Sequence, residues 1–257
     1  METERAGSGT ARRVELKVKR QDGQGTAPYW EHFTVAYRPN MNVISALMEI
    51  QRNPVNREGN PVRSVAWESN CLEEVCGACS MRINGRARQA CSALIDRLEQ
   101  PIVLEPMSTF PVEKDLVIDR QRMFDGLKQI RAWIAIDGTY ALGPGPRISP
   151  KDQQDAYVYS TCMTCGVCMD ACPNVGEQSP YLGPYAMGQI KYFNMHPTGA
   201  MMKEERLDAV IGEGGIGGCG NSQNCVRACP KEIPLTTAIA ELNGQANRYA
   251  LKKWLKG

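Results

Sequence analysis

The sequence predicts an α+β protein whose two halves differ in secondary structure. In the first half, apolar and polar residues alternate along several short segments, a pattern typical of strands. After about residue 120 helical spacing takes over, and no strand-like alternation follows residue 150. The length of 257 residues is enough for two modest domains. We therefore expect a flexible N-terminus over residues 1–12, a strand-rich domain over 13–120 and a helical domain over 121–257.

Local patterns support each element of the first domain. We expect four or five short strands, formed by segments 14–20, 31–38 and 101–107 and by a hairpin over 80–91. The hairpin turns at Asn84-Gly85, which is a strong short-range hairpin signal. Segment 41–53 has apolar residues at helical spacing and is followed by proline, so it predicts the one helix of this domain.

The second domain is predicted from helical spacing and loop residues. A helix is expected over 120–136, with one side formed by Met123, Leu127, Ile130, Trp133 and Ile134. Residues 142–150 are rich in glycine and proline and predict a loop. Segment 179–193, which contains several aromatic and proline residues, fits either a docking surface or a core segment. The basic tail over 241–257 predicts a helix packed on the domain rather than a membrane-surface contact.

Composition and hydropathy argue against a nucleic-acid partner and against a membrane-spanning segment. The net charge is only +2, from 30 basic and 28 acidic residues, and four Phe and four Trp are too few for a base-stacking surface. We therefore expect no nucleic-acid partner. The longest apolar stretch, around residues 130–136, is too short to cross a bilayer, and residues 1–13 lack an apolar signal core. We expect a soluble chain that meets a membrane only through partners.

The first cysteine motif is typical of a plant-type 2Fe–2S site. Its spacing is C-x4-C-x2-C followed by a distant fourth cysteine, and it consists of Cys71, Cys76, Cys79 and Cys91. Two irons need four converging thiolates, which a tight loop and a neighbouring strand can supply together. Gly77 allows backbone amides to turn toward the sulfides. A structural zinc site is the weaker alternative, because zinc motifs usually pair two C-x-x-C units or add histidines.

Two further cysteine runs repeat each other. Residues 162–173 read CMTCGVCMDACP, which has the C-x2-C-x2-C-x3-C-P spacing of bacterial ferredoxins. Residues 219–230 read CGNSQNCVRACP and match the first run, except that Ser222 stands where the first run has Cys165. In such pairs of runs, the fourth cysteine of each run ligates the other cluster. We expect a helix to start at Cys172, with Pro173 helping to fix its direction.

The cross-over rule divides these cysteines between two sites. A complete 4Fe–4S site is predicted from Cys162, Cys165, Cys168 and Cys229. The other site keeps only three thiols, those of Cys172, Cys219 and Cys225, with Ser222 at its fourth corner. Since a serine hydroxyl ionises far less readily than a thiol, we expect a 3Fe–4S cluster with Ser222 as a non-ligand; the alternative is that Ser222 is an oxygen ligand. The three sites use all eleven cysteines, so iron is the only metal expected.

Other motifs carry little chemistry. GEGGIG (212–217) matches a dinucleotide-binding pattern, but no strand precedes it, so an approach loop to Cys219 is favoured. His196 is one of two histidines and lies between the two runs, where a loop or packing role is the usual one. No nucleophilic triad, carboxylate pair or nucleotide site is evident, so no catalytic residue is predicted in this chain.

The three motifs, in this order and with Ser222 in the third, resemble the iron–sulfur subunits of succinate dehydrogenase and fumarate reductase (complex II). The resemblance implies an N-terminal β-grasp ferredoxin domain and an all-α ferredoxin domain. It implies a flavoprotein partner whose FAD oxidises succinate to fumarate, a step of the tricarboxylic acid cycle. Electrons would then pass through the 2Fe–2S, 4Fe–4S and 3Fe–4S clusters to quinone at a membrane anchor. The chain would lie at the cytoplasmic face of the membrane, held there by its partners.

Two departures from the family pattern concern the quinone site. Many ubiquinone-reducing members carry Trp shortly after the position of Pro173 and His directly after that of Cys219, whereas this chain has NVGEQ over 174–178 and Gly220. The stretch over residues 172–225 is more similar to that of Bacillus-type members. This resemblance implies a dihaem cytochrome b anchor with haem b, and menaquinone as the quinone. Alternative functions are a quinol:fumarate reductase subunit, a subunit of a soluble reductase without an anchor, and a zinc-stabilised scaffold without redox activity.

Overall fold

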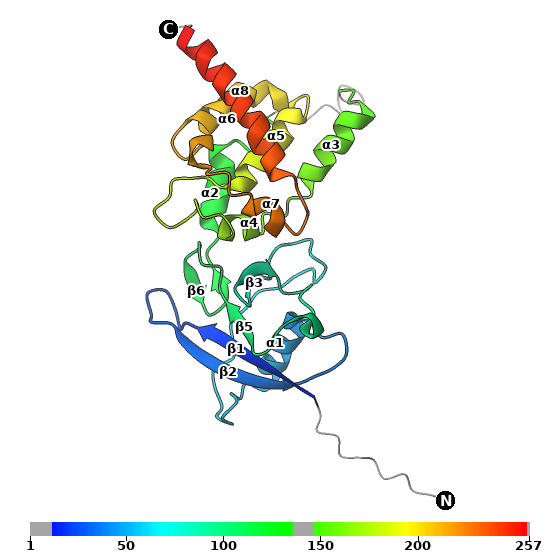
Figure 1. The fold of residues 1–257 in the computed structure, drawn as a ribbon, viewed down its shortest axis with the longest axis vertical. Helices are drawn as coiled ribbons and strands as arrows, with labels where there is room; N and C mark the ends of the chain where they lie inside the picture. Colours follow the sequence, from blue (N-terminus) through cyan, green and yellow to red (C-terminus); the bar gives the residue numbers. More distant parts are fainter. Residues whose placement is uncertain (1–11, 136–145, 256–257) are drawn as a thin grey trace, which may run out of the picture.

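A computed structural model describes residues 12–135 and 146–255 of the chain. The sheet-containing part and the helical part lie at opposite ends of an elongated molecule, with the C-terminal helix at the far end of the helical part (Figure 1). The expected flexible N-terminus falls almost wholly outside the described residues. Residue 136 of the predicted helix, residues 142–145 of the predicted loop and residues 256–257 of the tail also lie outside the described residues.

The first part contains a five-stranded sheet with the order β2-β1-β5-β3-β4. Its strands are β1 (Arg13–Arg20), β2 (Tyr29–Ala36), β3 (Ser80–Ile83), β4 (Arg86–Gln89) and β5 (Ile102–Glu105). The pairs β1–β2, β3–β4 and β3–β5 are antiparallel, and β1–β5 is parallel. The predicted strands are confirmed, and this mixed sheet is the β-grasp arrangement that the resemblance implied.

One helix completes the core of this domain. Alternate residues of β1 are fully buried, as the period-two pattern requires, and they meet the apolar face of α1 (Val43–Arg52). Leu47 and Ile50 of α1 are almost fully buried in this core. The helix begins after Asn42, whose side chain accepts a hydrogen bond from the Ser45 backbone N–H at 2.8 Å. A short 3₁₀ helix, η1 (Ile95–Arg97), precedes β5.

A second, two-stranded sheet was not predicted. It consists of β6 (Val112–Lys114) and β7 (Val117–Ile118), which are too short to show a period-two pattern. The buried turn residue Asp115 accepts hydrogen bonds from Arg20 Nε at 3.0 Å and Arg63 Nη1 at 2.7 Å. Burial alone would raise the pKa of Asp115, but the hydrogen bonds from Arg63 and Arg20 outweigh it and lower the pKa to about 2. These partners are remote in sequence, so the hairpin depends on tertiary contacts.

The second part is helical, and its described residues contain no strand. Its helices are α2 (Gln121–Gln129), α3 (Pro150–Ser160), α4 (Val167–Asp170), α5 (Pro184–Met195), α6 (Lys203–Ile211), α7 (Asn224–Ala228) and α8 (Leu235–Leu255). Two 3₁₀ helices, η3 (Gly199–Met202) and η4 (Ile216–Gly218), lie between them. In Figure 1 the short helices α4 and α7 face the sheet domain, whereas α5, α6 and α8 form the distal end.

The predicted helix over 120–136 is wrong in its C-terminal half. Helix α2 ends at Gln129, and Arg131 adopts a left-handed conformation with φ of 50°. The buried guanidinium of Arg206 donates to the carbonyl of Arg131 at 3.0 Å and to that of Trp133 at 2.9 Å. These carbonyls therefore point to Arg206 rather than along a helix axis, and Trp133 is 42% exposed instead of packed on the expected face.

The predicted packing of the tail on the domain holds only for the first part of helix α8. Leu235, Ala238, Leu242 and Ala246 are buried in the domain, as expected of a packed helix. The final turns contact α6 mainly through polar groups, including the ion pair of Lys253 with Asp208 at 2.9 Å. Trp254 is 77% exposed, because the helix extends past the apolar part of the core. None of the helices in the described residues is long and apolar enough to cross a bilayer.

The segment before α2 joins the two parts. Met107, Phe110 and Ile118 belong to the sequence range of the first domain but are buried in the core of the helical part. The Asp170 carboxylate at the end of α4 accepts hydrogen bonds from the backbone N–H groups of Ser108 and Thr109. Side chains and backbone of residues 107–118 therefore fix the orientation of the helical part on the sheet domain. The domain boundary near residue 120 stays a prediction.

Candidate metal centres

The loop from Cys71 to Cys79 directs backbone amides toward its first thiol. Leu72, Glu74 and Gly77 have positive φ angles of 62°, 57° and 74°, and these turns fold the loop back on itself. Cys71 Sγ accepts from three backbone N–H groups, at 3.4 Å from Glu73, 3.3 Å from Val75 and 3.2 Å from Cys76. The pKa of Cys71 is lowered to about 7, and the hydrogen bond from the Glu73 N–H contributes most to this decrease. The backbone N–H groups of the loop therefore stabilise the thiolate form of Cys71 relative to an ordinary cysteine.

Two further thiols of this motif, those of Cys79 and Cys91, flank the β3–β4 hairpin. Cys79 precedes β3 directly, and Cys91 lies in the turn after β4 rather than on a strand as expected. Both residues are buried. Burial raises the pKa of Cys91 to about 11, and the neighbouring thiol of Cys79 contributes to that increase. The hairpin thus brings Cys79 and Cys91 together beside the 71–79 loop, as the motif requires.

The two repeated runs also repeat the backbone conformation. Thr164 and Asn221 are equivalent in sequence and have φ of 51° and 54°. Gly166 and Gln223 are equivalent, have φ of 83° and 61°, and precede α4 and α7 respectively. Each run therefore makes the same pair of left-handed turns before a short helix. Ser222 lies between its two turns as Cys165 lies between those of the first run, so the structure places Ser222 at the equivalent site.

Four thiols line one small cavity. Its lining includes Cys162, Cys165 and Cys168 of the first run and Cys229 of the second. Burial raises the pKa of the first three thiols, that of Cys165 to about 11, and the nearby thiol of Cys229 raises each further. The structure thus brings Cys229 to the first run, as the cross-over rule predicts.

Three thiols and Ser222 line a second small cavity. The thiols are those of Cys219 and Cys225 from the second run and Cys172 from the first. We call this cavity the three-thiol site. Burial raises the pKa of Cys225, and the thiols of Cys172 and Cys219 raise it further. Cys172 follows the end of α4 and does not start a helix as expected, because Cys172-Pro173 turns the chain toward this site.

The donor sets fit iron–sulfur clusters. All eleven cysteines are free, and each of the eleven belongs to one of the three groups. In the described residues, no three His, Cys, Asp or Glu side chains are placed to hold a single metal ion. The thiols of the two helical sites instead line cavities, and burial raises the pKa of several of them. Bound iron favours the thiolate and so would offset that cost.

The 71–79 loop touches the first run. A Cβ atom on Gly77 would lie 2.8 Å from Cys165 Cβ, 2.9 Å from Cys165 Cα and 3.1 Å from the Met163 carbonyl oxygen. Only a residue without a side chain fits this approach between the two domains. The 71–79 loop therefore lies directly against the four-thiol cavity. Cys168 of that cavity is near Cys225 of the three-thiol site, which contributes to its raised pKa. The three thiol groups thus form a row.

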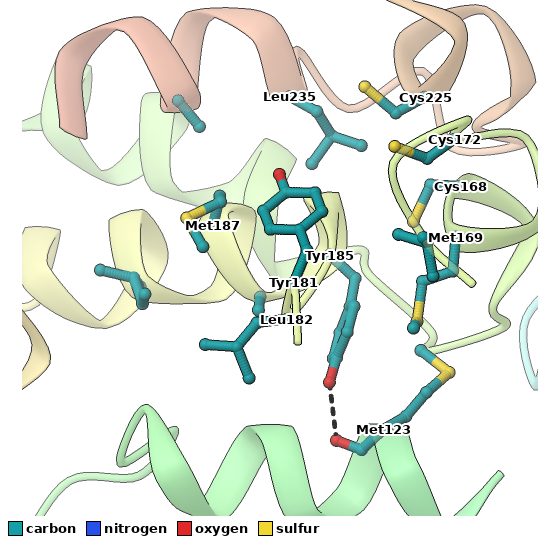
Figure 2. Close-up of a cluster of buried hydrophobic side chains, with 14 of the residues drawn as sticks. Met123, Cys168, Met169, Cys172, Tyr181, Leu182, Tyr185, Met187, Cys225 and Leu235 are labelled. Atoms are coloured by element: carbon teal, nitrogen blue, oxygen red, sulfur yellow. Dashed lines mark hydrogen bonds between the residues drawn. The ribbon is translucent and has the colours of Figure 1, made fainter. Parts of the chain in front are cut away.

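Asn174 and Tyr181 lie at the three-thiol site and were not predicted from the sequence. Asn174 lies over Gly220, where an added Cβ would be 2.7 Å from its Oδ1. The space that a side chain at position 220 would need is therefore taken by Asn174. Tyr181 also lines this site, and in Figure 2 its ring lies between Met187 and Leu235, with Cys172 and Cys225 beyond Leu235. The only sequence signal for Tyr181 was the aromatic segment 179–193, which the structure shows to be a core segment over its first half.

Two weaker motifs have structural roles. His196 ends α5, and its Nδ1 accepts a hydrogen bond from the Gly199 backbone N–H at 3.2 Å. Residues 212–217 follow α6 and pack on the chain near Pro180, where Gly214 approaches the Pro180 carbonyl closely. This segment leads to Cys219 and is directly preceded by helix α6 rather than by a strand, which agrees with the approach-loop interpretation.

Two family models match the chain in separate segments. Residues 15–125 match a 2Fe-2S iron-sulfur cluster binding domain, and residues 158–233 match a 4Fe-4S dicluster domain. The first match covers the sheet domain with its thiol loop. The second covers the two repeated runs. Together they describe the two kinds of cysteine spacing that the sequence shows.

Relatives and a solved structure extend these matches to nearly the whole chain. The succinate dehydrogenase iron-sulfur subunit of Bacillus subtilis is 61% identical over 94% of this chain and 95% of its own length. The fumarate reductase iron-sulfur subunit of Wolinella succinogenes is 26% identical over 90% of this chain and 96% of its own. A chain of the Mycobacterium smegmatis Sdh1 complex in the apo form shares the fold, with a TM-score of 0.77 at 24% identity. That alignment covers 95% of this chain and 98% of the other.

The contact at Gly77 predicts a position-specific effect of a methyl group. Both Gly77 and Gly85 have positive φ, but a Cβ on Gly85 meets no atom within 4 Å. Gly85→Ala should therefore cost only the left-handed strain of about 1–2 kcal/mol, a decrease in Tm of roughly 2–8 °C. Gly77→Ala adds the clash with Cys165 and should lower the Tm at least twice as far. Thermal unfolding of the two variants measures this difference, and equal decreases would contradict the contact.

Proposed function

This chain belongs to the family of iron–sulfur subunits of succinate dehydrogenase and fumarate reductase, and from this membership we propose that it carries electrons between a flavin and a quinone. In this proposal the chain is the iron–sulfur subunit of a succinate:quinone oxidoreductase. Electrons would enter at the 71–79 loop from the FAD of a flavoprotein partner. They would leave from the three-thiol site toward quinone at a membrane anchor. The chain itself would bind no succinate.

The distribution of the thiols carries this proposal. We propose that Cys71, Cys76, Cys79 and Cys91 hold a 2Fe–2S cluster, that Cys162, Cys165, Cys168 and Cys229 hold a 4Fe–4S cluster, and that Cys172, Cys219 and Cys225 hold a 3Fe–4S cluster. Each group would supply thiolate ligands and a shielded pocket, and the clusters would supply one-electron chemistry. A row of three groups in contact gives short steps where one long step would be slow. Gly77 and Phe110 support the row by packing against Cys165 and Gly166 at its centre.

The partners follow from the relatives and not from this chain alone. A succinate dehydrogenase subunit implies a flavoprotein on one side and a membrane anchor on the other, with the chain peripheral at the cytoplasmic face. The identity of 61% to a Bacillus protein favours an anchor of the dihaem cytochrome b type and menaquinone. The filled space at Gly220 supports this subtype, because a histidine there would displace Asn174.

A quinol:fumarate reductase is the second candidate, because it uses the same row in the opposite direction. The relative in Wolinella succinogenes is named a fumarate reductase iron-sulfur subunit and matches over 90% of this chain. The two candidates differ in their physiological direction, so steady-state rates of succinate oxidation and fumarate reduction by the purified complex discriminate between them. A reductase without an anchor would purify without a haem-containing subunit.

Metal content and EPR of the purified complex test the proposal. Three clusters of these types predict about nine iron atoms and about ten labile sulfides per chain, with no zinc. The reduced complex should show a 2Fe–2S signal, and the oxidised complex a nearly isotropic 3Fe–4S signal. Colourless protein with stoichiometric zinc would instead support the scaffold alternative and refute electron transfer.

Substitutions at Ser222 test the fourth corner of the three-thiol site. Because Ser222 lies at the position equivalent to Cys165, Ser222→Cys should supply a fourth thiolate, replace the 3Fe–4S signal by a 4Fe–4S cluster and lower the reduction potential. Slower quinone reduction should follow. Ser222→Ala is the matched control and should leave the 3Fe–4S signal and turnover unchanged. An oxidised 3Fe–4S signal that persists in Ser222→Cys would show that residue 222 does not face the missing corner, and a changed cluster in Ser222→Ala would show that the hydroxyl is a ligand.

A further inference from the structure

Tyr181 carries a buried hydroxyl without a nitrogen or oxygen hydrogen-bond partner in the described part of the protein. Only 1% of the residue is exposed, and among the described residues its Oη has no nitrogen or oxygen partner, while the thiol of Cys219 lies near enough to raise the pKa of the phenol. Desolvation of such a hydroxyl costs about 1–3 kcal/mol when no bond replaces those to water. Buried hydroxyls are therefore nearly always bonded, so this hydroxyl calls for an acceptor other than the nitrogen and oxygen atoms of the protein.

The other buried tyrosines of the helical part have ordinary partners. Tyr185 donates to the Met123 carbonyl oxygen at 2.8 Å, and Tyr159 donates to that of Pro234 at 3.4 Å. In Figure 2 the hydroxyl of Tyr181 points away from that of Tyr185, toward the side of the core where Leu235, Cys172 and Cys225 lie. Tyr181 is also the one of the three that lines the three-thiol site.

Close packing holds the ring of Tyr181 in this orientation. Gly218 lies flat against it, and a Cβ there would be 2.7 Å from Cδ2 and 2.8 Å from Cγ of the ring. The backbone on either side is anchored: Arg122 Nη2 donates to the Tyr181 carbonyl at 3.2 Å, and the Leu182 N–H donates to the Gly214 carbonyl at 2.8 Å. The hydroxyl therefore cannot turn toward solvent without unpacking this segment.

We propose that Tyr181 donates its hydroxyl hydrogen bond to a sulfur of the group held at the three-thiol site, either a bridging sulfide or the Cys219 thiolate, and so sets the reduction potential of that group. The inference rests on the proposed function, because it needs a cluster at this site. Tyr181 acts through the cluster and takes no part in the chemistry itself, so it is a tuning residue.

The direction of the effect follows from charge. One-electron reduction makes the cluster and its thiolates more negative, and a hydrogen bond to sulfur is stronger when the sulfur carries more charge. The bond from Tyr181 therefore stabilises the reduced form and raises the potential. Burial raises the pKa of the Tyr181 phenol, and the thiols of Cys219 and Cys172 raise it further, so the phenol keeps its proton. The last centre before the quinone thereby becomes a better electron acceptor.

Tyr181→Phe tests the proposal, because it keeps the packed ring and removes only the oxygen. EPR redox titration of the oxidised 3Fe–4S signal in the purified complex measures the midpoint potential. We expect the equilibrium constant for reduction to fall by roughly tenfold, which for a one-electron couple is about 59 mV. Tyr185→Phe is the matched control, since it removes a hydroxyl that donates to the Met123 carbonyl, and it should leave this potential unchanged.

The outcomes separate this inference from the proposed function. A normal 3Fe–4S signal with an unchanged potential in Tyr181→Phe overturns the role of the hydroxyl and leaves the proposed function intact. Absence of a 3Fe–4S signal in the unmodified complex overturns the proposed function itself. An equal shift in both variants overturns the inference too, because it would show a general loosening of the core. A shift in Tyr181→Phe alone supports it.

Discussion

The structure depends on the crossing of the two repeated cysteine runs. Each run makes two left-handed turns, a helix of four or five residues and a Cys-Pro turn, and this last turn delivers its thiol to the other run. The two helices are held side by side in part by Asn224, whose side chain donates to the Ala171 carbonyl at 3.1 Å. Without the thiol from the opposite run, the four-thiol site would keep only its three thiols from the first run. The three-thiol site would keep only its two thiols from the second run. The remaining helices cover the crossed pair and shield both cavities.

The sheet domain extends the row that the crossing creates. Its thiol loop meets the first run at Gly77, and residues 107–118 insert apolar side chains into the helical core. Polar anchors at Asp170 add orientation to this contact. The fold therefore fixes the relative positions of all three thiol groups through one interface between two dissimilar domains. Such rigidity suits electron transfer, because the rate of each step depends on a constant distance between centres.

Sequence spacing predicted the thiol groups because ligand spacing is a local property of a short loop. The same holds for β1, β2 and α1, whose apolar periods are long enough to read, and for the β3–β4 hairpin, which turns at Asn84-Gly85. The end of α2 was not predictable, since it depends on Arg206 taking the carbonyls of Arg131 and Trp133 from a remote helix. The β6–β7 hairpin similarly depends on Arg20 and Arg63. Tyr181 and Asn174 could not be assigned, because an unpaired hydroxyl and a filled space exist only in three dimensions.

The exchange of thiols between the runs is tested most directly by two serine variants studied by EPR in the purified complex. The 2Fe–2S signal serves as an internal standard for folded protein, because neither residue belongs to the first cysteine motif. Cys229→Ser should alter or remove the 4Fe–4S signal and retain the oxidised 3Fe–4S signal, whereas Cys172→Ser should do the reverse. These results would assign each fourth thiol to the opposite run. The opposite pattern, with loss of the 3Fe–4S signal in Cys229→Ser alone, would show that each run keeps its own cysteines and would contradict the account.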